Sequence, residues 1–111
     1  MLGVFRLFPS GDQRGWALKV VGLEVLAEFA RTHGEVRSQL QVWLAEAEEA
    51  RWKVPDDIQR RYPTASFLAE NRVVFNLKGR KYRMVVKVSY RLQIVMIERV
   101  GTHAEYSKWE L

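Results

Sequence analysis

Few side chains in this sequence could carry out acid–base chemistry. The two histidines, His33 and His103, lie far apart in the chain, and there is no cysteine, no His-Glu-x-x-His motif and no carboxylate-rich loop. The sequence also lacks a glycine-rich phosphate-binding loop and a Gly-x-Ser-x-Gly motif. We therefore expect no metal and no organic cofactor, and the pattern disfavours a metalloenzyme, a nucleoside triphosphatase or a serine hydrolase.

Basic residues are concentrated in one stretch of the sequence. The chain has 18 Lys and Arg against 13 Asp and Glu, which gives a net charge of +5. Residues 72–91 include no acid, and their basic members are Arg72, Lys78, Arg80, Lys81, Arg83, Lys87 and Arg91. Such a surplus on a small domain favours polyanionic partners, because binding releases counterions. The sequence therefore predicts a basic patch.

This stretch and the C-terminal end together could cleave RNA without a metal. The polar face of the strands expected here carries Asn76, Lys81, Arg83 and Lys87. His103 and Tyr106 share a face if their segment is helical. RNA supplies its own nucleophile, the 2′-hydroxyl, so an enzyme needs a base, an acid and cations for the phosphoryl oxygens. Charge and periodicity alone still favour simple binding of a nucleic acid or an acidic partner, because a polar strand face is usually only solvated.

The first half of the chain predicts helices. Residues 1–15 show no sustained period and are expected to form a loose extension, whereas residues 16–21 fit a short strand. Apolar residues then recur at helical spacing from Leu23 to Ala30, and again from Val36 to Ala47. Both stripes are expected to pack in the core. Turn residues dominate from Trp52 to Ser66, with one helical turn around residues 58–62.

The second half predicts strands. Residues 72–78 and 81–90 alternate between apolar and polar, and Gly79-Arg80 between them suits a tight hairpin. A two-residue turn pairs Leu77 with Tyr82 and Asn76 with Arg83, so that all apolar pairs fall on one face.

A third strand is expected over residues 92–100, hairpinned through Tyr90-Arg91 and covered on both faces as a central strand would be. Its register is open: a three-residue loop sets Arg99 beside Arg83, and a two-residue loop sets Glu98 there. Gly101-Thr102 should break the strand before a short terminal helix in residues 103–111. The fold class expected is α+β, with two N-terminal helices packed on an antiparallel sheet.

Several motifs together resemble the HigB family of type II toxins. They are Trp52, Asp57-Ile58, Ala65-Ser66-Phe67, Val74-Phe75-Asn76, Gly79-Arg80-Lys81-Tyr82-Arg83 and Gly101-Thr102-His103-Ala104-Glu105-Tyr106. The likeness runs from about Trp16 to the end, and the hairpin and the final hexapeptide are its specific parts. The chain differs from the family at Arg80, where members tend to have Asn.

The resemblance implies a single RelE-like toxin domain over residues 16–111. It also implies a cytoplasmic mRNA interferase that acts on the ribosome and is silenced by a helix-turn-helix antitoxin, HigA. Under it, Arg83 stabilises the phosphoryl charge, while His103 and Tyr106 transfer protons. The residues that would hold RNA or its phosphates are Asn76, Arg80, Lys81 and Lys87.

Two other functions stay open at this point. RelE-like folds also include toxins that inhibit DNA gyrase without cutting RNA, and fold does not settle function. An inactive remnant that only binds RNA or antitoxin is the other alternative. No apolar run reaches the roughly 20 residues of a membrane span, and the opening MLGVFRLF does not read as a signal peptide, so we expect no membrane association.

Overall fold

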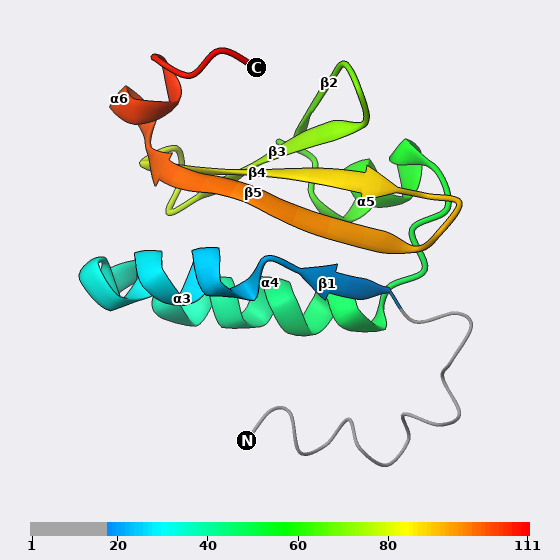
Figure 1. Ribbon diagram of the computed structural model, residues 1–111, viewed down its shortest axis with the longest axis horizontal. Coiled ribbons are helices and arrows are strands. Elements are labelled where there is room, and N and C mark those ends of the chain that lie inside the picture. Colours follow the sequence, from blue (N-terminus) through cyan, green and yellow to red (C-terminus); the bar gives the residue numbers. More distant parts are fainter. Residues whose placement is uncertain (1–17) are drawn as a thin grey trace.

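The computed structural model describes residues 18–111, and within them a mixed sheet separates two layers of helix. Figure 1 shows α3 (Leu23–Thr32) and α4 (Arg37–Glu49) on one side of the sheet and α6 (His103–Tyr106) on the other. The strands lie in the order β1-β5-β4-β3-β2. Their bounds are β1 Lys19–Val21, β2 Ser66–Leu68, β3 Arg72–Leu77, β4 Tyr82–Ser89 and β5 Ile94–Thr102. The extension expected over residues 1–15 and the start of the strand expected over 16–21 lie outside the described residues.

The two helices follow the apolar stripes that predicted them. Leu26 of α3 and Leu40, Trp43 and Ala47 of α4 are buried in the core. A short 3-10 turn, η1 (Gly34–Val36), joins the two helices. None of the helices in residues 18–111 is long and apolar enough to cross a membrane.

The single helical turn expected around residues 58–62 is a longer helix, α5 (Pro55–Arg61). Proline suits the first position of a helix, where its missing N–H costs no hydrogen bond. The Asp57 carboxylate accepts hydrogen bonds from the backbone N–H groups of Lys53 (2.9 Å) and Val54 (3.2 Å). The turn residues Pro55 and Asp57 therefore start a helix here.

The hairpin of β3 and β4 has the predicted register. Leu77 pairs with Tyr82, Asn76 with Arg83, Phe75 with Met84 and Val73 with Val86. At the turn, positive φ angles occur at Lys78 (51°) and Gly79 (68°), but not at Arg80. The departure from the family's Asn at position 80 therefore places no side chain in a strained conformation.

The sheet is mixed, and not wholly antiparallel as expected. β1 runs parallel to β5, with Val20 opposite Val95. The three residues of β1 are too few to indicate the direction of the strand. The long connection from β1 to β5 permits the parallel pairing. β2, an edge strand antiparallel to β3, was also not expected, because its three residues are too few to show alternation.

Both registers considered for the third strand are wrong. Arg83 pairs with Gly101, and Ser89 pairs with Ile94, so residues 90–93 form the connection. Val85 faces Arg99 while Val86 faces Ile97, which leaves Glu98 as the extra residue of a β-bulge. Gly101 and Thr102 belong to β5 and do not end it.

The strand covered on both faces is β4, and not β5 as expected. Val85 and Val86 point to opposite faces of β4 and neither is exposed. On β5, by contrast, Met96 is 41% exposed. β4 is the middle strand of the sheet, whereas β5 has only the short β1 on its other side.

Candidate functional site on the open face of the sheet

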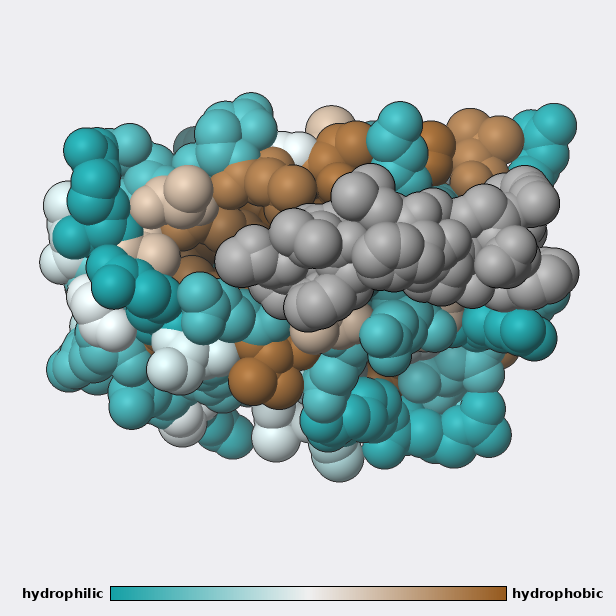
Figure 2. Space-filling view, turned by 90° about the horizontal axis from the view of Figure 1, so that it is seen from below, coloured by the Kyte–Doolittle hydropathy of each residue, from teal (hydrophilic) through white to brown (hydrophobic). Residues whose placement is uncertain are grey.

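A groove between α3 and α4 is the first of two candidate surfaces. It has a volume of about 490 Å³ and is lined by Leu23, Leu26, Ala27, Ala30, Arg31, Arg37, Leu40, Gln41 and Leu44. Figure 2 views the molecule from this helical side and shows apolar side chains among the polar ones. Arg31 is paired with Glu28, and Arg37 donates to the Ala30 carbonyl. The lining offers shape but no group suited to acid–base catalysis.

The opposite face of the sheet carries Arg83. Arg83 points away from the core because its neighbours in β4, Tyr82 and Met84, point into it. The guanidinium carbon lies 4.6 Å from the centre of the Tyr106 ring, a distance at which a cation is attracted to an aromatic face. The Nε of Arg83 is buried and has no hydrogen-bond partner among the described residues. Arg83 as a whole is half-buried and has no ion-pair partner in residues 18–111, so its remaining donors are suited to receive an anionic oxygen.

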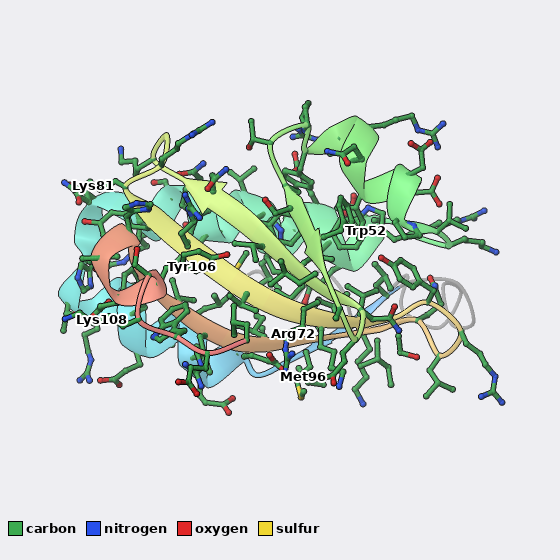
Figure 3. The ribbon with its side chains drawn as sticks, turned by 90° about the horizontal axis from the view of Figure 1, so that it is seen from above. Trp52, Arg72, Lys81, Met96, Tyr106 and Lys108 are labelled. Carbon is green, nitrogen blue, oxygen red and sulfur yellow. The ribbon has the colours of Figure 1, made fainter. Side chains whose placement is uncertain are left out.

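The end of β5 brings Tyr106 to this place. Because Gly101 lies opposite Arg83, the chain that follows starts α6 directly beside it. Thr102 caps the helix: its hydroxyl accepts from the Glu105 N–H (3.1 Å), and the Glu105 carboxylate accepts from the Thr102 N–H (2.8 Å). This capping box fixes the direction of a helix that would be too short to form alone. Figure 3 shows Tyr106 above the strands.

Gly101 also leaves room for Trp109. A Cβ at position 101 would lie 2.7 Å from Glu105 Oε1 and 2.8 Å from Trp109 Cζ2. Trp109 in turn meets the Tyr106 ring edge-on, with the centroids 5.8 Å apart. The missing side chain of Gly101 therefore permits the packing that holds Tyr106 over Arg83.

His103 lies one helical turn from Tyr106, as their spacing predicted. It is the first residue of α6, and its backbone N–H donates to the Lys81 carbonyl (3.0 Å). Its imidazole is exposed. The structure thus places Arg83 and Tyr106 in direct contact, and it joins the first residue of α6, His103, to the hairpin through its backbone.

Lys81 forms an ion pair with Glu35, a residue that the sequence did not point to. Its ammonium lies 3.0 Å from Glu35, which also accepts a hydrogen bond from the Tyr82 hydroxyl. The hydrogen bond from Tyr82, followed by that from Lys81, lowers the pKa of Glu35, and Glu35 raises the pKa of Lys81. Glu35 precedes α4 in the chain, so no local pattern pointed to it.

The other predicted phosphate ligands are spread over the same face and its edge. Asn76 is the cross-strand partner of Arg83, and its amide donates to the Thr64 carbonyl (3.1 Å). Arg80 is exposed in the hairpin turn. Lys87 is four residues further along β4, roughly 13 Å from Arg83 at the usual rise of a strand. These residues do not converge on one point, so they could contact an extended ligand at several places.

Two further cations of this face were not predicted as site residues. Arg72 is paired with Glu98 (2.9 Å) and Glu70 (3.4 Å). Arg99 lies over the ring of Trp109, 5.2 Å from its centre. The wrong register for β5 hid the place of Arg99, and the only signal in the sequence was the spacing of three residues between Tyr106 and Trp109. In residues 18–111, no cluster of His, Cys, Asp or Glu could hold a metal ion.

Comparison with known families gives one match. The family model HigB_toxin, described as the RelE-like toxic component of a toxin-antitoxin system, matches residues 36–109. This range is more than half of the chain, and it includes the hairpin and α6. No curated protein matches the chain.

Proposed function

The chain belongs to the HigB family, the RelE-like toxic components of toxin–antitoxin systems, and from that premise we propose that it is an endoribonuclease. In this proposal it cleaves messenger RNA without a metal and so stops translation. The observation that carries the proposal is the Arg83 guanidinium, which lies against Tyr106 and forms no ion pair with an acidic side chain in residues 18–111. A cation placed in this way suits a phosphate whose charge increases during reaction.

Arg83 is the proposed electrostatic catalyst. When the 2′-hydroxyl attacks the neighbouring phosphate, negative charge builds on the phosphoryl oxygens. The guanidinium would donate hydrogen bonds to them, and Arg favours phosphate because its donors are planar and fixed. Tyr106 covers one face of the guanidinium and so limits its orientation. Little reorganisation is then needed as the transition state forms.

His103 and Tyr106 are the proposed proton-transfer pair. The imidazole of His103 can accept a proton and suits the base that takes the 2′-hydroxyl proton. A phenol stays protonated at neutral pH and suits the acid that protonates the leaving 5′-oxygen. Both residues belong to α6 and lie one turn apart. We propose that one acts on the 2′-hydroxyl and the other on the 5′-oxygen of the same phosphate.

The proposal extends to substrate and partner. We place the toxin domain at residues 16–111 and the target RNA on the ribosome, with Asn76, Arg80, Lys81 and Lys87 holding the strand on either side of the cleaved phosphate. The family implies an antitoxin partner. We propose that it is of the HigA type, with a helix-turn-helix domain.

Induced expression in a bacterial host tests this function. Growth and the 5′ ends of several cellular mRNAs are compared, by primer extension, between wild type, His103→Ala and His33→Gln. The control changes the other histidine, which stacks on Phe29 in the helical layer. Discrete 5′ ends from wild type and His33→Gln but not from His103→Ala support the proposal. Growth arrest with intact transcripts would instead indicate a protein target such as DNA gyrase, and unimpaired growth would indicate an inactive remnant.

A further inference from the structure

Arg99 is an exposed cation that lies over an aromatic ring. Its guanidinium carbon is 5.2 Å from the centre of the Trp109 ring. In residues 18–111, no acidic side chain forms an ion pair with Arg99. Arg72, on the same face, is by contrast paired with Glu98 and Glu70. Arg99 therefore keeps its charge and its hydrogen-bond donors for a ligand.

The pair of Arg99 and Trp109 adjoins the pair of Arg83 and Tyr106. Arg99 precedes Gly101 by two residues on β5, and Gly101 is the cross-strand partner of Arg83. Two residues of a strand span about 7 Å and return to the same face. Trp109 also contacts Tyr106 edge-on. The two Arg–aromatic pairs are thus neighbours on the open face of the sheet.

Further along β5 this face remains accessible. Met96, the outward residue before the bulge, is 41% exposed. Figure 3 labels Tyr106 and Met96 at separate places along the open face, with the strands running between them. A strand of nucleic acid could follow this direction beyond Arg83.

We propose that Arg99 and Trp109 form a nucleotide subsite for single-stranded RNA, next to the phosphate that Arg83 binds. This inference rests on the proposed nuclease function. Unpaired bases bind by stacking on aromatic rings or on Arg guanidinium planes. Arg99 is exposed, lies over the Trp109 ring and has no acidic partner in residues 18–111. In the proposed subsite its planar guanidinium stacks on a base and donates hydrogen bonds to base or phosphate oxygens. The subsite binds the nucleotide that flanks the cleaved bond.

The test substitutes Arg99 and not Trp109, because loss of Trp109 would also disturb Tyr106. Wild type, Arg99→Ala, Arg99→Lys and Lys108→Ala are compared on an RNA that wild type cleaves. Affinity is measured on the same RNA with a 2′-deoxy sugar at the mapped cleavage site, which removes the nucleophile. Lys108→Ala is the matched control, since Lys108 is exposed beside Trp109 in the chain and its loss changes the net charge equally.

If the subsite exists, removal of the Arg99 side chain should weaken RNA binding and leave the rate of cleavage at saturating RNA unchanged. Arg99→Ala should raise both Kd and KM about tenfold, as loss of one stacked base would. Its kcat should stay within about twofold of wild type, because the reacting atoms lie at Arg83. Arg99→Lys should recover little, since an ammonium has no plane to stack. Lys108→Ala should resemble wild type.

Several results would overturn the inference. If Arg99→Ala and Lys108→Ala have the same Kd and KM, Arg99 contributes only its general charge. A fall in kcat alone shows that Arg99 acts on the chemistry. Lost toxicity in cells with unchanged RNA binding and cleavage shows that this surface contacts a protein. If wild type cleaves no RNA, the nuclease proposal fails, and the affinities of wild type, Arg99→Ala and Lys108→Ala for an unmodified single-stranded RNA still decide whether the subsite exists.

Discussion

The guanidinium of Arg83 lies 4.6 Å from the ring centre of Tyr106, so a residue of the middle strand meets a residue of the last helix. The contact exists because Gly101 lies opposite Arg83 and the chain turns into α6 at once. Every step of the proposed mechanism depends on this placement. The substitutions that follow distinguish the position of Tyr106 over Arg83 from the proton transfer proposed for Tyr106.

Gly101→Ala should displace α6 and lower the cleavage rate at least about tenfold, while the sheet stays folded. The added Cβ would lie 2.7 Å from Glu105 Oε1 and 2.8 Å from Trp109, so the helix or the indole must move. The rate is measured together with thermal unfolding. Gly34→Ala is the control, because a Cβ at position 34 meets nothing within 4 Å. Wild-type turnover by a folded Gly101→Ala protein would show that the position of α6 does not matter.

Tyr106→Phe should lower kcat about a hundredfold and leave KM nearly unchanged, the range for loss of one proton-transfer group. Phe keeps the ring over Arg83 and removes only the hydroxyl. Tyr106→Ala removes both and should also weaken RNA binding. Steady-state kinetics on one RNA distinguishes these effects. If Tyr106→Phe is as active as wild type, Tyr106 positions Arg83 and transfers no proton.

Glu35→Gln should change how the stability of the fold depends on pH. The pKa of Glu35 is lowered from its usual 4.5, first by the hydrogen bond from Tyr82 and then by that from Lys81. A carboxylate with a lowered pKa stabilises the fold above pH 4.5, and this contribution is lost as the pH falls through the folded value. The urea midpoint of wild type should therefore drop more than that of Glu35→Gln between pH 5 and pH 3. Equal drops would show that the Glu35 contacts contribute nothing to stability in solution.

The sequence predicted α3, α4 and the β3–β4 hairpin, because apolar periodicity and Gly79 specify them locally, whereas α5 is longer than the single turn expected. It could not predict the direction of β1, which has only three residues, or the register of β5, which depends on the bulge at Glu98. An extra residue shifts the phase of an alternating pattern, but residues 94–97 are all apolar, so there was no alternation in which the shift could be seen.

The sequence could name candidate site residues but not their arrangement. Arg83, His103 and Tyr106 were named from charge, spacing and family resemblance, but their separation depends on where β5 ends. Arg99 and Trp109 were missed because stacking between a strand residue and the C-terminal tail is a tertiary contact. Glu35 was missed for the same reason, since it meets Lys81 across the molecule.

The most direct measurement is single-turnover cleavage of one RNA by Arg83→Ala and Lys87→Ala, with thermal unfolding of each variant. Both substitutions remove one cation from the same face of β4, but only Arg83 contacts Tyr106. We expect Arg83→Ala to lose about a hundredfold or more in rate at saturating RNA, the range for loss of one transition-state donor, with the fold intact. Lys87→Ala should weaken only binding. A folded Arg83→Ala protein that cleaves at the wild-type rate, or one that fails to fold, would remove Arg83 from the site and contradict the account.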